Sequence, residues 1–225
     1  MTTPALSLSA LVLGATGLVG RRCLDLLLGD DAYGRVVVLA RKPAPREHPK
    51  LRWHVTDFAR VHEYGRLLGV DNVFCCLGTT IRAARSREAF HKVDFGYVVG
   101  AARATAESGA RQLLLVSALG ADAHSRVFYN RVKGEAERAI RDLPFRGTQI
   151  FRPSLLLGQR EEFRLGERVA ALTLAPLSLL LSGTARKYRP VRATAVAEAM
   201  VRVAKIAPPG VNIFESDRIV ALAAA

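Results

Sequence analysis

The chain has 225 residues, half of them hydrophobic, which predicts one folded domain with a substantial core rather than a disordered or fibrous protein. Its formal net charge is +13, but the 27 arginines and 6 lysines are spread along the whole chain. A nucleic-acid-binding protein would gather them in one stripe, so we expect no specific nucleic-acid site. Residues 1–5 lack the features of a signal peptide, and the longest apolar stretch, 169–181, is too short for a membrane span. We expect that stretch to form a buried helix or a helix that covers the active site.

The three cysteines and five histidines point to no disulfide framework and no metal site. Cys75 and Cys76 are adjacent, so they cannot pair as a framework would require, and the histidines show no ligand spacing. Free thiols are typical of a reducing compartment, and we therefore expect a cytoplasmic location. Both adjacent cysteines are interpreted as small residues at a strand end, not as nucleophiles.

The first predicted elements are a strand over Ser7–Leu13 and a helix over Leu18–Leu28, joined by the glycine-rich turn Gly14–Gly20. Such a turn lets the backbone approach a pyrophosphate closely, and the helix start supplies oriented N–H groups. The spacing is Gly-x-x-Gly-x-x-Gly rather than the strict dinucleotide fingerprint. The turn therefore favours a dinucleotide site, with an ordinary structural turn as the alternative.

Strands and helices continue to alternate along the chain. Apolar runs predict further strands at 35–40, 51–55, 71–77 and 112–117, and helical character at 57–68 and 86–108. This alternation predicts an α/β protein with a doubly wound, Rossmann-like parallel sheet. After Pro153 the alternation loosens. We expect residues 1–225 to form one dinucleotide-binding domain, in which about 154–225 contribute the small substrate-side part.

The end of the second predicted strand favours NADP(H) over NAD(H). An NAD-specific site usually has an acidic residue there for the ribose 2′-hydroxyl, but this chain has Arg41 and Lys42. Two cations would instead bind the 2′-phosphate of NADP, with arginine offering two-point hydrogen bonding. The alternative is a basic turn without a ligand.

Tyr129 and Lys133 are four residues apart, on one face of a helix, and Ser117 ends the fifth predicted strand. The carboxyl edge of an open sheet is where ligands bind. A carbonyl that accepts hydride needs a proton donor, and a lysine cation nearby favours the phenolate form of a tyrosine. A serine hydroxyl can donate a hydrogen bond to the same carbonyl oxygen and orient it. These three residues are the predicted catalytic residues; the alternative is a tyrosine and a lysine on a solvated helix.

With these motifs the sequence resembles the atypical members of the short-chain dehydrogenase/reductase superfamily, and within them the HIV-Tat-interacting oxidoreductase group. The resemblance covers roughly residues 8–215. The residues that carry it are Gly14–Gly17, Phe74–Thr80, Val93–Asp94, Tyr97–Val98, Ser117, Gly120–Asp122, Tyr129, Lys133–Glu135 and Phe151–Pro153.

The resemblance implies an NADPH-binding Rossmann domain with a Ser–Tyr–Lys site. It places Cys76–Gly78 along the ribose or nicotinamide, Asp57 near the adenine, and Arg152–Ser154 near the nicotinamide. With the glycine turn and the basic pair, the predicted cofactor-binding residues are Gly14, Thr16, Gly17, Leu18, Val19, Gly20, Arg41, Lys42, Asp57, Phe58, Cys76, Leu77, Gly78, Thr79, Tyr129, Lys133, Arg152, Pro153 and Ser154.

The sequence favours an NADPH-dependent oxidoreductase acting on a small carbonyl or alcohol substrate. A redox-sensing protein that binds NADP(H) without turnover is the alternative from another class, and it would need no Tyr–Lys pair. A nucleotide-sugar epimerase or dehydratase would use the same three residues, but usually with a larger C-terminal substrate region. The substrate itself, a protein partner and a homo-oligomer are left open.

Overall fold

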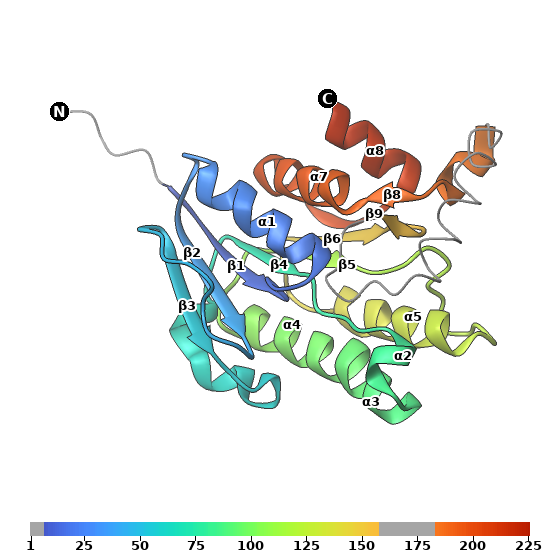
Figure 1. Ribbon diagram of the computed structural model, residues 1–225, viewed down its shortest axis with the longest axis horizontal. Coiled ribbons are helices and arrows are strands. Elements are labelled where there is room, and N and C mark those ends of the chain that lie inside the picture. The colour runs from blue at the N-terminus through green and yellow to red at the C-terminus, as the bar shows by residue number, and fades with distance from the viewer. Residues whose placement is uncertain (1–6, 158–182) are drawn as a thin grey trace.

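The computed structural model describes residues 7–157 and 183–225 (Figure 1), and within them a seven-stranded parallel sheet dominates. The strand order is β3-β2-β1-β4-β5-β6-β9, and every neighbouring pair is parallel. This is the predicted Rossmann-like sheet. Its strands are β1 (Leu8–Leu13), β2 (Tyr33–Ala40), β3 (Leu51–Val55), β4 (Asn72–Cys75), β5 (Gln112–Val116), β6 (Gly147–Arg152) and β9 (Gly210–Glu215).

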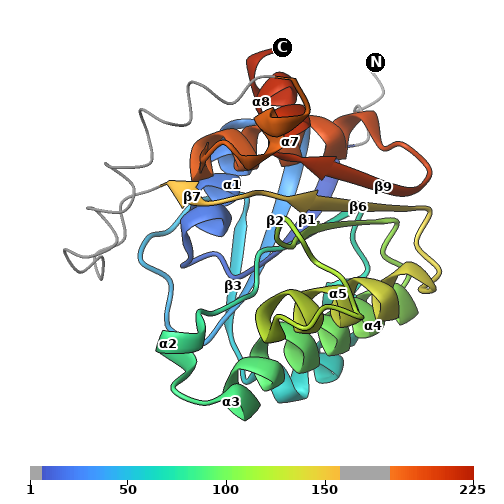
Figure 2. The ribbon, with the colours of Figure 1, turned by 90° about the vertical axis from the view of Figure 1, so that its right-hand side faces the viewer.

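Helices cover both faces of the sheet, as Figures 1 and 2 show from two directions. One face carries α1 (Leu18–Gly29), α7 (Ala193–Ile206) and α8 (Ser216–Ala224); the other carries η1 (Phe58–Leu68), α4 (Val98–Glu107) and α5 (Phe128–Arg141). Each face has its own apolar cluster. Because both faces are buried, the central strands are continuous apolar runs, as in Val36–Ala40 of β2.

Two predicted helical segments are less regular than expected. The segment over 57–68 is a 3-10 helix with non-helical backbone at Arg60 and at Gly65, where φ is +41°. The segment over 86–108 divides into α3 (Arg87–His91), a π-helical turn η2 (Lys92–Tyr97) and α4. Ahead of α3 lies the short α2 (Ile81–Ala84). Apolar periodicity predicts a single helix here because it does not detect a local change in hydrogen-bond spacing.

The C-terminal part completes the main sheet instead of standing apart from it. Strand β9 pairs with β6, a strand that the sequence analysis missed, and α7 packs against α1. A second, two-stranded sheet joins β7 (Leu156–Leu157) to β8 (Val191–Arg192), next to the short helix η3 (Gly183–Tyr188). The helix expected over 169–181 lies outside the described residues. The contribution of residues 154–225 to the substrate side stays a prediction.

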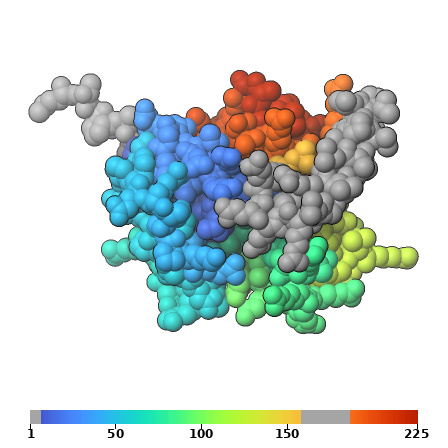
Figure 3. Space-filling model, viewed as in Figure 1, coloured from blue at the N-terminus to red at the C-terminus, as the bar shows by residue number. Residues whose placement is uncertain are grey.

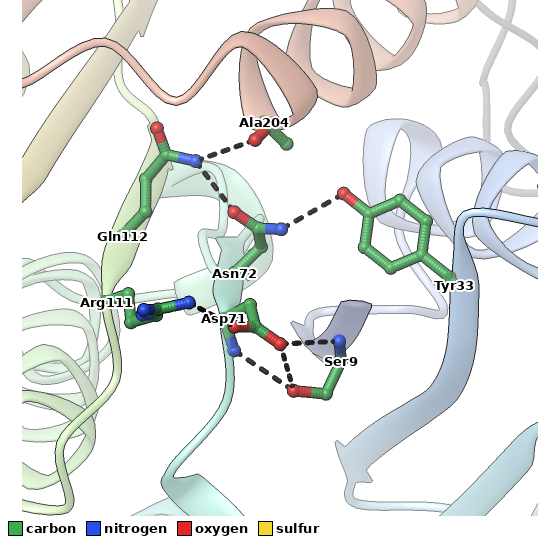
Figure 4. A network of polar contacts seen from close by, with 7 residues as sticks. All are labelled: Ser9, Tyr33, Asp71, Asn72, Arg111, Gln112 and Ala204. Carbon is green, nitrogen blue, oxygen red and sulfur yellow. Dashed lines mark hydrogen bonds and ion pairs between the residues drawn. The ribbon is translucent and has the colours of Figure 1, made fainter. Parts of the chain in front are cut away.

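A buried polar network closes the amino-terminal edge of the sheet (Figure 4). Asn72 Nδ2 donates to the Tyr33 hydroxyl at 3.1 Å, and Gln112 Nε2 donates to Asn72 Oδ1 at 2.7 Å and to the carbonyl oxygen of Ala204 at 3.1 Å. The network therefore joins β2, β4, β5 and the end of α7. It lies at the edge opposite to the one at which parallel sheets bind their ligands.

The surface view in Figure 3 shows α1 with the β2–β3 end of the sheet (blue and cyan) on the same face as the α2–α3 segment (green). Among the helices that the structure describes, none combines the length and apolar character needed to cross a membrane. Within the same residues, no group of three or more His, Cys, Asp or Glu side chains could hold a metal ion.

Candidate active site

The strand order reverses between β1 and β4, which lie side by side at the centre of the sheet. At such a switch point the connections from the two strands leave in opposite directions and open a crevice at their carboxyl ends. The glycine turn follows β1, and residues 76–79 follow β4. Both predicted cofactor segments therefore border this crevice.

The three glycines of the turn have different structural roles. Gly14 has φ of +81°, and a Cβ there would lie 2.4 Å from the carbonyl oxygen of Cys76. A Cβ on Gly20 would lie 2.2 Å from the carbonyl oxygen of Gly14, so α1 starts in direct contact with the turn. At Gly17 the nearest atom is 3.3 Å away. Gly14 and Gly20 are thus required by the fold, whereas Gly17 mainly leaves space in front of the helix.

The start of α1 is suited to an anion. Gly17 at its N-cap has no side-chain capping hydrogen bond, and the first turn contains no acidic residue. Thr16 is exposed, Leu18 is half-buried, and Val19 is buried against the sheet. The N–H groups of Leu18 and Val19 belong to the first turn, where backbone donors lack a partner within the helix.

The loop after β2 lies beside the glycine turn, because β2 pairs with β1 in parallel register. Arg41 and Lys42 are both exposed, and within residues 7–157 and 183–225 neither has a carboxylate within ion-pair distance. Asp57 is exposed at the start of η1, where its carboxylate accepts the N–H of Ala59 at 3.0 Å, and Phe58 is buried. The basic pair is therefore free to meet a phosphate.

Cys75 ends β4 and Cys76 begins the loop that follows it, and the pKa of both thiols is raised above the ordinary value. Burial raises the pKa of Cys75 to about 12. The hydrogen bond with Cys23, together with burial, raises the pKa of Cys76 well above its ordinary value. Leu77 is buried, and a Cβ on Gly78 would lie 3.2 Å from Asp94 Oδ1 and 3.5 Å from Lys133 Nζ. The loop thus runs directly past the lysine of the predicted catalytic set.

Lys133 is buried and paired with a carboxylate that the sequence analysis did not assign to the site. Its Nζ lies 2.7 Å from Asp94 Oδ1, and Asp94 Oδ2 accepts the backbone N–H of Thr79 at 2.8 Å. Burial lowers the pKa of Lys133, but the charge of Asp94, with further contributions from Tyr129 and the Asp94 hydrogen bond, outweighs it and the net pKa is raised. Lys133 therefore stays an ammonium ion at neutral pH.

Tyr129 lies one turn before Lys133 on α5 and is half-buried. Its ring packs at 5.5 Å, between centroids, on the ring of the fully buried Phe90. That contact orients the phenol from the α3 side. The spacing of four residues places Tyr129 and Lys133 on the same face of α5, as predicted.

Ser117 follows β5 directly and is joined to the same helix face by a second unassigned carboxylate. Its Oγ donates to Glu137 Oε1 at 2.5 Å. The Glu137 carboxylate also accepts Arg152 Nε at 3.0 Å and Arg152 Nη2 at 2.5 Å. The Arg152 guanidinium is thus held by Glu137, and a contact with the nicotinamide stays a prediction.

The last two predicted cofactor residues follow β6 and serve the local backbone. The carbonyl oxygen of Pro153 accepts the N–H of Leu119 at 2.9 Å. The N–H of Ser154 donates to Ser216 Oγ at 2.9 Å, and its hydroxyl donates to the carbonyl oxygen of Arg189. These contacts tie the ends of β5 and β6 to the start of α8.

Sequence reasoning missed Asp94 and Glu137 as members of the site. Tyr129, Lys133 and Glu137 recur every four residues, so the spacing alone places Glu137 on the predicted catalytic face. Asp94 carries a charge between apolar residues of a helical segment, which is the only sequence signal that it is buried. Neither signal identifies the residue to which the carboxylate binds. Asp94 of η2 binds Lys133 of α5, and Glu137 of α5 binds Ser117 after β5, so each contact joins two different elements.

A strand–turn–helix unit at the switch point, a glycine-rich turn and an exposed basic pair are typical of a nucleotide-binding Rossmann protein. A family model described as NAD(P)H-binding matches residues 14–166, and the chain belongs to this family. It is 36% identical to Protein HTATIP2 of Rattus norvegicus, over 72% of this chain and 68% of the relative. It is also 36% identical to Protein FMP52, mitochondrial, of Eremothecium gossypii, over 71% of each chain.

Solved structures with low sequence identity share the fold. MoeE5 in complex with UDP-glucose and NAD superposes with a TM-score of 0.68 at 16% identity, covering 96% of this chain and 81% of the other. A human epimerase family protein with NADPH gives a TM-score of 0.62 at 19% identity, covering 92% and 74%. These comparisons confirm the Rossmann-like fold predicted from the alternation of strands and helices, and the family model and HTATIP2 confirm the resemblance.

The expected cytoplasmic location is wrong on these comparisons. Several fungal relatives, from Eremothecium gossypii to Debaryomyces hansenii, are named as mitochondrial proteins. Free cysteines indicate a reducing environment, which more than one compartment provides, so they could not identify the compartment.

Proposed function

We propose that this protein is an NADPH-dependent oxidoreductase that transfers hydride to or from a small carbonyl or alcohol substrate. The observation that carries the proposal is the α5 face, where Tyr129 and the buried ammonium of Lys133 lie one turn apart beside the loop that follows β4. The family model supports the dinucleotide, and this face supplies the groups that proton transfer requires.

The residues of the glycine turn fit a pyrophosphate, because Gly17 leaves space in front of the helix and the start of α1 has no competing cap. Arg41 and Lys42 would hold the 2′-phosphate, which favours NADPH. When bound, the nicotinamide supplies or accepts the hydride.

Tyr129 donates the proton that the carbonyl oxygen gains, and takes it back in the reverse direction. The Lys133 ammonium favours the phenolate that this transfer leaves behind. Asp94 keeps Lys133 charged and fixed in place, since it binds the loop and the lysine together. Ser117 lies at the carboxyl edge of the sheet, where its oxygen can orient the reacting group.

Incubation with NADPH and a carbonyl panel of benzaldehyde, cyclohexanone and diacetyl tests the proposal. We expect NADPH absorbance to fall with at least one member of the panel, and the rate to depend on Tyr129. Tight NADPH binding with no turnover of any member would contradict an oxidoreductase and favour a redox-sensing protein.

A further inference from the structure

Glu137 and Ser117 are both buried from solvent and are hydrogen-bonded to each other. The exposed fraction of Glu137 is 1% and that of Ser117 is 6%. A buried carboxylate is costly unless it is paired and hydrogen-bonded. Here Arg152 supplies two N–H donors, at 3.0 and 2.5 Å, and the Ser117 hydroxyl supplies a third hydrogen bond. Arg141 Nη2 is also 3.5 Å from Glu137 Oε2.

We propose that Glu137 is a positioning residue that holds the hydroxyl proton of Ser117, so that Ser117 Oγ faces the substrate as a hydrogen-bond acceptor. This role rests on the function proposed above. A serine hydroxyl has one proton and two lone pairs. With the proton directed to Glu137 at 2.5 Å, only the lone pairs remain for the substrate side.

Arg152 makes this arrangement stable without competing for the serine. Its guanidinium has only N–H donors, so it can bind the carboxylate but cannot accept the serine proton. The bond from Nη2 runs to Oε2 and leaves Oε1, which also accepts Nε, to receive the hydroxyl. The strand ends of β5 and β6 hold Ser117 and Arg152 in register, with the Ser117 N–H donating to the carbonyl oxygen of Phe151 at 2.8 Å.

The acceptor role has a consequence for the reaction. Ser117 accepts a hydrogen bond from the hydroxyl of an alcohol substrate or from the phenol of Tyr129, and it does not donate one to the carbonyl oxygen. Tyr129, and not Ser117, then donates the proton that the carbonyl oxygen gains. The sequence-based expectation was that the serine would donate, and the Ser117–Glu137 contact reverses this direction.

The substitution Glu137→Gln reverses the polarity of the hydrogen bond. The glutamine oxygen keeps the place of Oε2, which faces Arg152 Nη2 at 2.5 Å and Arg141 Nη2 at 3.5 Å. The amide nitrogen then takes the place of Oε1, where it loses the 3.0 Å bond from Arg152 Nε and donates to Ser117 Oγ. One lone pair of Ser117 Oγ is then occupied by the glutamine N–H. The hydroxyl hydrogen no longer points to residue 137 and can turn to the substrate. We expect kcat with the best member of the carbonyl panel to fall roughly ten- to a hundredfold, as for the loss of a hydrogen bond to a charged group.

A double-mutant cycle separates positioning from general structural damage. If Glu137 acts through Ser117, the loss in kcat for Glu137→Gln is close to that for Ser117→Ala, and the double variant is no slower than the slower single variant. The Kd for NADPH, measured by fluorescence titration, stays within about twofold of wild type, since Glu137 is not in the predicted cofactor set. Glu135→Gln is the matched control: it lies on the same helix, is paired with His91 at 3.7 Å, and should leave kcat unchanged.

If the losses in kcat multiply in the double variant, or if Glu137→Gln has the wild-type kcat, the proposed role of Glu137 is wrong. Neither result would contradict the proposed oxidoreductase activity. No turnover by wild-type protein that binds NADPH would remove the proposed function and this role with it. If Glu137→Gln does not fold, Glu137→Asp replaces it in the same cycle. Aspartate keeps the charge opposite Arg152 but is one methylene shorter, so it cannot reach both Arg152 and Ser117.

Discussion

Lys133 and Asp94 form a buried ion pair whose two members come from α5 and η2. The exposed fraction of the lysine side chain is 9% and that of the aspartate side chain is 0%. Removal of one partner from such a pair leaves an uncompensated charge. We predict that Asp94→Asn lowers the free energy of unfolding by about 3–5 kcal/mol. Thermal unfolding should show this as a Tm lower by roughly 6–20 °C.

The pH dependence gives this prediction a second readout. In wild type the pKa of folded Lys133 is raised above its unfolded value, so the stability from the pair is complete at neutral pH and is lost only as the pH rises through the folded value. Asp94→Asn removes the aspartate charge that raises the pKa of Lys133, so burial, which is the largest effect, lowers the folded pKa. The unfolded chain then binds more protons, and stability rises with pH. The Tm difference between the proteins should therefore shrink between neutral pH and pH ~10; a constant difference would contradict the account.

The proposed preference for NADPH over NADH rests on Arg41. A charge-assisted contact with the 2′-phosphate contributes about 1.5–3 kcal/mol, so NADPH should bind roughly ten- to a hundredfold more tightly than NADH. We predict that Arg41→Ala removes most of this preference in calorimetric titrations of both cofactors. Arg46→Ala is the matched control, because Arg46 lies in the same loop but is already paired with Asp25 at 2.5 Å. Equal affinities in wild type would refute the assignment.

At the scale of elements, the turn between β1 and α1 has glycines three residues apart, of which two serve the fold and one leaves space for a ligand. We predict that Gly17→Val folds but loses NADPH binding, because its side chain enters the space in front of the helix. Wild type should gain roughly 2.7 kcal/mol of stability when NADPH exceeds its Kd a hundredfold, and the variant should gain none. Gly20→Ala should instead lower the Tm without ligand, since its Cβ would lie 2.2 Å from the Gly14 carbonyl oxygen. NADPH-induced stabilisation that survives in Gly17→Val would make the turn merely structural.

The strands that could be predicted from the sequence are those that are continuously apolar. Val36–Leu39 and Leu113–Leu115 are buried on both faces of the sheet and are recognisable without any tertiary information. Strand β6 was missed because it opens with Gly147, Thr148 and Gln149, which suggest a loop. Thr148 and Gln149 are nonetheless buried, and Gln149 Nε2 donates to the carbonyl oxygen of Pro208 at 2.7 Å. A pattern of residue types does not reveal such a partner.

The candidate site also has features that the sequence predicts and features that it does not. The sequence predicts the positions of Ser117, Tyr129 and Lys133 on their elements, because strand ends and helix spacing are local properties. It does not predict that Asp94 fixes the lysine or that Glu137 fixes the serine. A single acidic residue on a helix is usually solvated, and only contacts between η2, α5 and the strand ends bury these two.

At the scale of the whole molecule, the two edges of the sheet have separate roles. The amino edge is closed by the amide network of Asn72 and Gln112, which joins the strands to α7 (Figure 4). The carboxyl edge brings together the turn, the basic loop and the α5 face from segments far apart in the sequence. A hydride-transfer enzyme needs all three, whereas a protein that only senses NADPH needs the first two.

The central claim is therefore tested most directly by the hydroxyl of Tyr129, measured for binding and turnover in the same preparation. We predict that Tyr129→Phe keeps its ring packing on Phe90 and its NADPH affinity, while kcat falls by about 10²–10⁴-fold. Tyr64→Phe is the control, because its hydroxyl donates to the carbonyl oxygen of Val55, away from the α5 face. Unchanged turnover in Tyr129→Phe, with wild-type affinity for NADPH, would contradict the account.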